Sequence, residues 1–201
     1  MEILLFSLKK KTTAMEEEIE RCTELLRNGK VLLYPTDTVW GIGCDATNEE
    51  AVRRIYTIKQ RQESKSMLVL LDRFERVPLY VEKLPLIAWD LVPTTERPTT
   101  YIYPGARNFA KNMIPADGTI AIRIAGSSFC QKLISRFGKP IVSTSANISG
   151  TTAPATFADI TDEIRNAVDY IVPERFSDST DFKPSRIIKF MDDYNFCIVR
   201  E

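Results

Sequence analysis

The sequence contains no histidine among its 201 residues. This absence excludes histidine-based catalytic triads, histidine-ligated zinc and the usual general base at neutral pH. Any catalysis must therefore use carboxylates, hydroxyls, cations, backbone dipoles or a metal that arrives on substrate phosphates. Cysteine is also sparse. The 4 cysteines form no CxxC pair and no disulfide framework, so we expect reduced and mostly buried thiols.

Long apolar runs are missing as well. No segment reaches the ~20 apolar residues that a membrane-spanning helix needs, and no cleavage site follows the short run at 3–6. We therefore expect a soluble, cytoplasmic protein that has no membrane partner. Lys plus Arg equals Asp plus Glu at 27 each, so the overall charge does not indicate nucleic-acid binding, and any direct RNA contact should be weak and local.

The length suits one domain, residues 1–201, with its own core. Apolar patterning alternates between strand-like and helix-like segments, which predicts an α/β fold with a mixed sheet flanked by helices. Predicted strands are 3–8, 30–34, 66–71, 99–103, 119–124, 139–142, 170–172, 187–190 and 196–200, the last two as a hairpin. Predicted helices are 15–27, 49–60, 72–80, 84–91, 127–137 and 156–168.

The segment from 35 to 47 does not have the composition of a core element. It follows a strand that Pro35 stops, and it contains hydroxyls, carboxylates and glycines. Open α/β sheets bind their ligands in loops beyond the ends of strands. We therefore interpret 35–47 as a pocket-forming loop.

Cations gather at the end of the next predicted helix. Lys59 and Arg61 lie in its last turn, and Lys65 follows. Cations placed beside a polar loop suit a polyanion such as a nucleoside triphosphate. Lysine and arginine are also common at helix ends because they complement the helix dipole. The spacing alone leaves both interpretations open.

Two further features also allow two interpretations each. Arg123 lies inside an apolar run, where an arginine needs either an internal carboxylate or a bound anion as its partner. The segment 143–150 is rich in hydroxyls and follows a predicted strand. It could bind phosphate or ribose through side chains and turn amides, or it could be an ordinary polar turn.

The motifs taken together, in their order and spacing from about residue 15 to residue 190, resemble the threonylcarbamoyl-AMP synthase family of YrdC-like proteins. The motifs that carry the resemblance are Tyr34-Pro35-Thr36-Asp37-Thr38, Gly41-Ile42-Gly43-Cys44-Asp45, Lys59-Gln60-Arg61 and Ser143-Thr144-Ser145-Ala146-Asn147-Ile148-Ser149-Gly150. The resemblance implies a twisted sheet with a concave, positively lined cavity. It also implies the synthesis of threonylcarbamoyl-adenylate and pyrophosphate from L-threonine, bicarbonate and ATP, with Mg²⁺ held through the ATP phosphates. The adenylate would supply threonylcarbamoyladenosine modification beside the tRNA anticodon through a separate transferase complex.

The resemblance also implies roles for individual residues. Lys59 and Arg61 match the KxR pair of the family and would be catalytic residues at the triphosphate. The implied nucleotide-binding residues are Lys59, Arg61, Lys65, Arg123, Ser143, Ser145 and Asn147. The implied threonine-binding residues are Thr36, Arg123 and Ser185. We expect the Lys59 and Arg61 side chains to be surface charges, so that removing either would leave folding intact.

The sequence departs from the family pattern in one place. Glu96-Arg97-Pro98 stands where many relatives have a Pro-Gly-Pro-like turn, which affects the local wall of the pocket. The chain otherwise resembles the short form without an additional C-terminal domain. The alternative interpretations are a non-catalytic RNA-binding module of the same fold and an adenylating enzyme for a different amine. Pyrophosphate release that requires both threonine and bicarbonate would distinguish the synthase from either.

Overall fold

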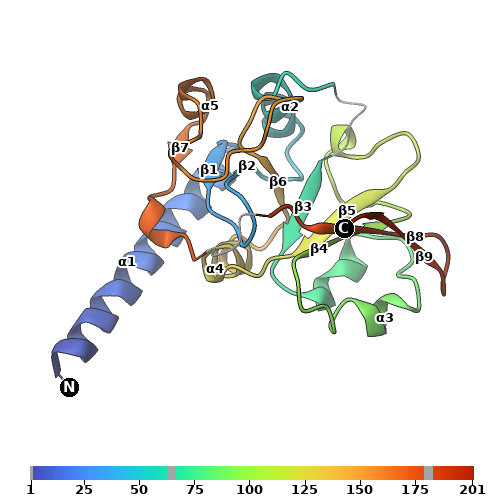
Figure 1. Ribbon diagram of the computed structural model, residues 1–201, viewed down its shortest axis with the longest axis horizontal. Helices are drawn as coiled ribbons and strands as arrows, with labels where there is room; N and C mark the ends of the chain where they lie inside the picture. Colours follow the sequence, from blue (N-terminus) through green and yellow to red (C-terminus); the bar gives the residue numbers. More distant parts are fainter. Residues whose placement is uncertain (1, 63–66, 179–182) are drawn as a thin grey trace.

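A twisted, mixed 9-stranded sheet forms the centre of the molecule (Figure 1). The computed structural model describes residues 2–62, 67–178 and 183–201, with side chains from Thr13 onward. Its strands are β1 (Leu32–Tyr34), β2 (Gly41–Gly43), β3 (Leu68–Leu71), β4 (Thr99–Tyr103), β5 (Ile120–Ile124), β6 (Ile141–Ser145), β7 (Tyr170–Ile171), β8 (Arg186–Phe190) and β9 (Phe196–Arg200). The strand order is β7-β1-β2-β6-β3-β5-β4-β8-β9.

The pairs β1–β7, β3–β5 and β4–β8 are parallel, and the remaining pairs are antiparallel. The helices are α1 (Glu2–Arg27), α2 (Glu49–Ile58), α3 (Ala88–Leu91), α4 (Ser128–Phe137) and α5 (Asp162–Ala167), with 3-10 turns η1 (Phe74–Leu79), η2 (Lys111–Met113) and η3 (Glu174–Phe176). The N-terminal end of α1 extends away from the rest of the chain (Figure 1). Of the helices in the described ranges, none combines the length and apolar character needed to cross a membrane. The predicted fold class, a mixed sheet flanked by helices, is confirmed.

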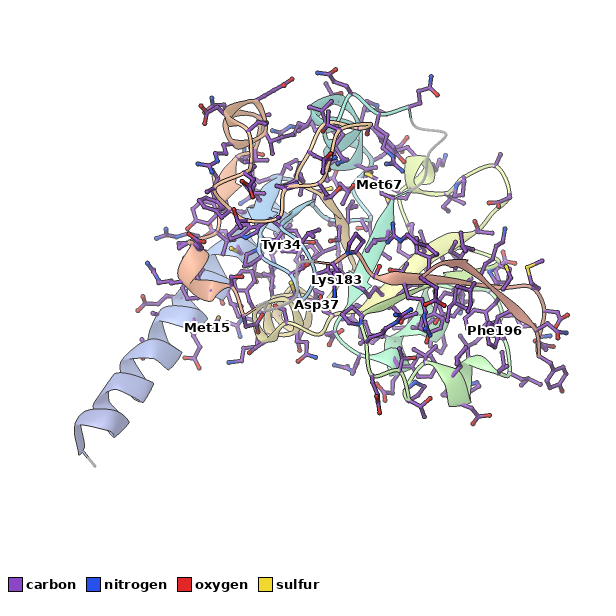
Figure 2. The ribbon with its side chains drawn as sticks, viewed as in Figure 1. Met15, Tyr34, Asp37, Met67, Lys183 and Phe196 are labelled. Carbon is purple, nitrogen blue, oxygen red and sulfur yellow. The ribbon has the colours of Figure 1, made fainter. Side chains whose placement is uncertain are left out.

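Two apolar clusters cover the two faces of the sheet. In β1, Leu32 and Tyr34 belong to the cluster that includes buried residues of α1 and α4, whereas Leu33 belongs to the cluster under α2. Because successive strand residues point to opposite faces, a strand that is buried on both sides reads as a continuous apolar run. This is why the central strands could be identified from the sequence. Figure 2 shows Tyr34 in the interior of the molecule.

Local capping signals set the ends of α4. The Ser127 hydroxyl accepts a hydrogen bond from the backbone N–H of Cys130 at 3.2 Å. Gly138 ends the helix in the left-handed region, with φ of 79°. Both residues suit these positions, since serine is a favoured N-cap and glycine adopts positive φ without strain. The predicted bounds of this helix are therefore confirmed.

Helix α2 begins at a side-chain cap that can be tested. The Asn48 Oδ1 atom accepts a hydrogen bond from the Ala51 N–H at 3.0 Å. We expect Asn48→Ala to lower the free energy of unfolding by about 1 kcal/mol, because a backbone donor then loses its partner. Urea denaturation would measure the change. Asn48→Asp is the matched control, since its carboxylate can accept the same bond, and equal loss in both variants would contradict a capping role.

The helix predicted for 84–91 is limited to α3, and the one predicted for 72–80 is the 3-10 turn η1. Three further sequence predictions about secondary structure are wrong. Residues 3–8 belong to α1 rather than to a strand, which agrees with the run of leucine and lysine, both good helix formers. The helix predicted for 156–168 is limited to α5, because the Asp159 carboxylate accepts hydrogen bonds from the Thr156 N–H and hydroxyl at 2.9 and 2.8 Å. Such a local turn competes with helix formation.

The third error concerns the two segments that we interpreted as loops. Residues 41–43 form β2, and β6 continues through Ser145. The two strands pair antiparallel, with Gly41 opposite Ser145. This pairing joins the two motif segments directly, although they are far apart in sequence.

Candidate functional site

Most of the predicted site residues line one cavity of about 430 Å³. It lies where the loop after β1, strands β4 to β6 and the start of β8 meet. The predicted residues that line it are Thr36, Arg61, Arg123, Ser143, Ser145, Asn147 and Ser185. Lys59 does not line the cavity, but its side chain donates hydrogen bonds to the backbone of Ser145 and Asn147, which do. Lys65 lies outside the described residues.

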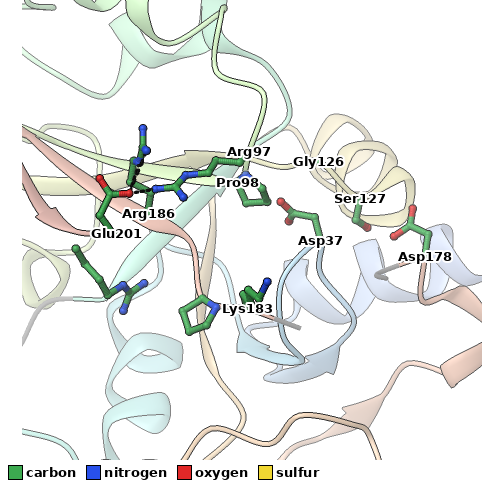
Figure 3. Close-up of a pocket in the computed structure, with 11 residues that line it drawn as sticks. Asp37, Arg97, Pro98, Gly126, Ser127, Asp178, Lys183, Arg186 and Glu201 are labelled. Carbon is green, nitrogen blue, oxygen red and sulfur yellow. Dashed lines mark hydrogen bonds and ion pairs between the residues drawn. The ribbon is translucent and has the colours of Figure 1, made fainter. Parts of the chain in front are cut away.

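A larger cavity of about 610 Å³ adjoins the first one and shares Pro184 and Arg200 with it. Figure 3 shows its charged lining, with Asp37 facing across from Arg97 and Arg186. In Figure 2, Asp37 and Lys183 lie near the middle of the molecule. Arg97 and Pro98, which belong to the segment that departs from the family pattern, line this second cavity. Arg97 also forms an ion pair with Glu201.

The arginine of β5 has both an internal partner and a place in the lining of the first cavity. Arg123 is 3% exposed, and its Nη2 atom lies 3.3 Å from the Asp37 Oδ1 atom. Its Nη1 atom donates to the Thr38 hydroxyl at 2.8 Å. The Thr36 hydroxyl lies 3.0 Å from that of Thr38 and donates to the Val39 carbonyl. The ion pair and the cavity position therefore coexist, and the loop after β1 orients the guanidinium.

Ser185 and Arg200 form the opposite side of the same cavity. The Ser185 hydroxyl lies 2.8 Å from that of Thr100, and Arg200 donates to the Ser185 carbonyl at 2.7 and 3.1 Å. Burial and the charge of Arg123 lower the pKa of Arg200. Sequence reasoning missed Arg200, because a lone arginine in a terminal strand carries no motif. Only the pairing of β4, β8 and β9 brings it to the cavity.

Ser145, at the end of β6, and Asn147, just after it, form a compact polar turn. The Ser145 hydroxyl donates to Asn147 Oδ1 at 2.5 Å, and Asn147 Nδ2 donates to the Thr151 carbonyl at 2.7 Å. Lys59 supports this turn, because its Nζ atom donates to the Ser145 and Asn147 carbonyls at 2.5 and 2.7 Å. The structure thus brings the predicted KxR and SxN pairs together.

A backbone turn at Gln60 makes the side chains of Lys59 and Arg61 point in different directions. Gln60 has a φ of 49°, in the left-handed region. The Arg61 N–H bonds to the Tyr56 carbonyl at 2.9 Å, and the Gln60 N–H bonds to the Thr57 carbonyl at 3.0 Å. This is the Schellman pattern that ends helices. It leaves Lys59 buried, while Arg61 reaches the cavity.

The burial of Lys59 corrects one expectation. The side chain is only 2% exposed, so it is not the surface charge that the helix-end position predicted. Removing it would take away the hydrogen bonds that its charged Nζ atom donates to the Ser145 and Asn147 carbonyl groups, which contribute about 1.5–3 kcal/mol each. We therefore no longer expect folding to be unaffected when Lys59 is replaced.

The pKa of Lys59 gives a prediction about pH. Burial, together with the nearby charge of Arg61, lowers the pKa of Lys59 from 10.5 to about 8. Between these values the unfolded chain holds this proton and the folded chain has released it, so stability should rise with pH. We expect the free energy of unfolding of the wild type to increase relative to that of Lys59→Met as the pH rises through this range. Urea denaturation at several pH values tests this, and parallel curves would contradict it.

The arrangement can bind and polarise an anionic substrate. Arg61, Arg123 and Arg200 line one cavity together with hydroxyls and an amide. Guanidinium groups bind phosphate and carboxylate oxygens through paired hydrogen bonds, and a site shielded from water strengthens this attraction. Among the side chains that the structure describes, no cluster of three or more carboxylates or thiols could hold a metal.

Comparisons with known proteins show which family the chain belongs to. The family model for Sua5, YciO and YrdC, described as "Telomere recombination", matches residues 24–201. A threonylcarbamoyl-AMP synthase from Pseudoalteromonas translucida is 34% identical over 81% of this chain and 87% of its own. One from Hahella chejuensis is 34% identical over 84% of this chain and 91% of its own.

Solved structures show the same fold. The structure of P. abyssi Sua5 complexed with L-threonine has a TM-score of 0.82 at 25% identity, over 90% of this chain and 53% of that one. The chain therefore spans about half the length of P. abyssi Sua5. The structure of E. coli YciO has a TM-score of 0.78 at 24% identity, over 91% of this chain and 88% of that one. The chain belongs to the Sua5/YciO/YrdC family.

Proposed function

We propose that this protein synthesises L-threonylcarbamoyl-adenylate from L-threonine, bicarbonate and ATP, with release of pyrophosphate. The observation that carries the proposal is the convergence of Arg61, Arg123 and the Ser145–Asn147 turn on one cavity. Relatives of similar length that carry the name threonylcarbamoyl-AMP synthase support the same reaction. The reaction needs no histidine and no covalent enzyme intermediate, which agrees with the residues available.

The chemistry has two steps. The threonine amine attacks the carbon of bicarbonate and water leaves, which gives an N-carboxylate. An oxygen of this carbamate then attacks the α-phosphorus of ATP, and pyrophosphate leaves. Such transfer depends mainly on positioning the reactants and on neutralising charge on phosphate oxygens.

Each side of the cavity has a role in this proposal. Arg61 contacts the phosphates, and the hydroxyl and amide groups of Ser143, Ser145 and Asn147 hold the nucleotide. Thr36, Arg123 and Ser185 bind threonine, with the guanidinium of Arg123 facing its carboxylate. ATP enters as its Mg²⁺ complex, so the metal arrives on the substrate phosphates. Lys65 would add a further cation near the phosphates.

The adenylate product would leave this protein and become the substrate of another enzyme. A reactive adenylate of this kind supplies a threonylcarbamoyl group to an adenosine of tRNA, and a separate transferase complex would carry out that step. We place the protein in the cytoplasm on this basis. We expect any direct RNA contact to be weak. Non-specific RNA binding requires exposed cations that neutralise phosphates, and Arg123 in the cavity is only 3% exposed.

Mass-spectrometric detection of the adenylate made by the purified chain tests the proposal. We expect threonylcarbamoyl-adenylate and pyrophosphate to form only when threonine, bicarbonate and ATP are all present. Substituting other amino acids for threonine tests the identity of the amine. Binding of RNA without any such turnover would overturn the proposal in favour of a non-catalytic module, and turnover with another amine would reassign the substrate.

A further inference from the structure

Asp37 is a largely buried carboxylate to which the proposed reaction gives no role. Its side chain is 11% exposed, and it lines the second cavity but not the first. Its Oδ1 atom lies 3.3 Å from the Nη2 atom of Arg123, which lines the first cavity. Arg123 therefore lies between a fixed carboxylate of its own protein and the cavity that we assign to the substrates.

The guanidinium of Arg123 is held by two protein contacts that do not satisfy it completely. Its Nη1 atom donates to the Thr38 hydroxyl at 2.8 Å, and Asp37 faces its Nη2 atom. Within the described residues, its Nε atom has no hydrogen-bond partner. A buried arginine needs partners for its charge and its N–H groups, and a carboxylate bound in the first cavity would add to them. The protein contacts fix the direction of the group before such a ligand arrives, which lowers the cost of binding.

The position of Asp37 depends in turn on a glycine. A Cβ atom at Gly126 would lie 3.0 Å from the Asp37 Oδ2 atom and 3.2 and 3.3 Å from its Cβ and Cγ atoms. Gly126 comes soon after β5, the strand that carries Arg123. Figure 3 shows Asp37 on the loop after β1, with Gly126 in the lining of the same cavity. The Asp37 carboxylate thus packs closely against backbone, and a larger residue at 126 would displace it.

We propose that Asp37 is a positioning residue, which orients the Arg123 guanidinium toward the carboxylate of threonine. Gly126 leaves the space that Asp37 needs for this contact. The inference rests on the proposed function, because that function places the threonine carboxylate at Arg123. Charge alone predicts the opposite effect of Asp37, since a negative group near the site repels a carboxylate. The sign of the change on removing Asp37 therefore distinguishes orientation from simple charge.

A second ligand distinguishes orientation of Arg123 from direct contact with the substrate. L-threoninol keeps the ammonium group and the side chain of threonine but has a hydroxymethyl group in place of the carboxylate. If Asp37 acts through Arg123, its removal weakens threonine and leaves threoninol unaffected. If Asp37 instead binds the ammonium group, its removal weakens both ligands equally. The ratio of the two affinities is thus a readout that a general loss of structure would not change.

The experiment measures both affinities by calorimetry for the wild type, Asp37→Asn and Asp178→Asn. We expect Asp37→Asn to weaken threonine by about 10- to 100-fold, the size of a hydrogen bond to a charged group, and to leave threoninol unchanged. Asp178→Asn is the matched control, because Asp178 lines the same second cavity but accepts a hydrogen bond from the Ser128 N–H at 2.8 Å. Both affinities should be unchanged in the control. Equal losses for the two ligands in Asp37→Asn, or tighter binding of threonine, would overturn the inference.

Two further variants keep the test decisive if Asp37→Asn folds poorly, since that change leaves a buried arginine without its counterion. Gly126→Ala keeps both charges and displaces the carboxylate, so the preference for threonine over threoninol should fall; an unchanged preference would contradict the inference. The double variant Asp37→Asn with Arg123→Met removes both charges together. It should bind threonine as weakly as Arg123→Met alone, because Asp37 then has nothing to orient. A further loss of threonine affinity in the double variant would show that Asp37 acts by another route.

The wild-type measurements separate this inference from the proposed function. A wild-type chain that prefers threonine to threoninol but makes no threonylcarbamoyl-adenylate would contradict the proposed reaction alone. Normal adenylate synthesis with equal affinities for threonine and threoninol would contradict the inference, because no group would then be recognising the carboxylate. Normal synthesis together with equal losses of both ligands in Asp37→Asn would likewise contradict only the positioning role.

Discussion

Replacing Gly43 with alanine should destabilise the protein by about 3 kcal/mol or more. A Cβ atom at this position would overlap the carbonyl oxygen of Val142 and would lie 2.6 Å from Tyr34 Cε1 and 3.1 Å from Ile141 Cγ2. These neighbours belong to β1 and β6, which flank β2 on its two sides, so neither can move without breaking the sheet. Thermal unfolding should show a loss of roughly 6–12 °C in Tm.

Gly41→Ala is the matched control, two residues earlier in the same strand. Its Cβ atom would lie 3.2 Å from the Ser143 hydroxyl and 3.4 Å from Thr36 Cγ2, contacts that a small side-chain shift relieves. We therefore expect a much smaller loss of stability from Gly41→Ala. If Gly43→Ala were as stable as the wild type, the close approach of β2 to β6 would be wrong, and with it the contact between the two motif segments.

The elements that local signals determine could be predicted closely. Helix α4 has a serine N-cap, an apolar stripe and a glycine at its end, and each of these acts within a few residues. The terminal strands β8 and β9 are short, mainly apolar runs that a turn rich in polar residues joins. Strands β2 and the end of β6 were missed, because what makes them strands is the pairing of Gly41 with Ser145, which no local pattern contains.

The sequence could predict which residues belong to the site, but not where their side chains point. The motifs identified residues such as Arg61, Arg123 and Asn147, which do line one cavity. Spacing could not indicate that Gln60 adopts a positive φ, which sends Lys59 inward and Arg61 outward. It also gave no signal for Arg200, whose place in the cavity depends on the order of the strands.

Arg61→Met should reduce the kcat/KM for adenylate formation by about 10²- to 10³-fold, while the free energy of unfolding changes by no more than about 1 kcal/mol. The guanidinium lines the cavity at the end of α2, where it can neutralise charge that develops on the phosphates as pyrophosphate leaves. Because this interaction strengthens in the transition state, most of the loss should fall on kcat. Single-turnover assays of pyrophosphate release would separate this step from substrate binding.

Arg53→Met is the matched control on the same helix. Its side chain is 58% exposed, pairs with Glu49 at 3.7 Å and does not line the cavity, so turnover should be unchanged. Arg61→Lys should lie between the wild type and Arg61→Met, since lysine keeps the charge but loses the paired donors of arginine. Wild-type turnover in Arg61→Met would instead mean that Arg61 only complements the dipole of α2. In that case the phosphates would have to bind against Arg123 and Arg200 on the far side of the cavity, and the similarity to the KxR pair would carry no information about the catalytic step.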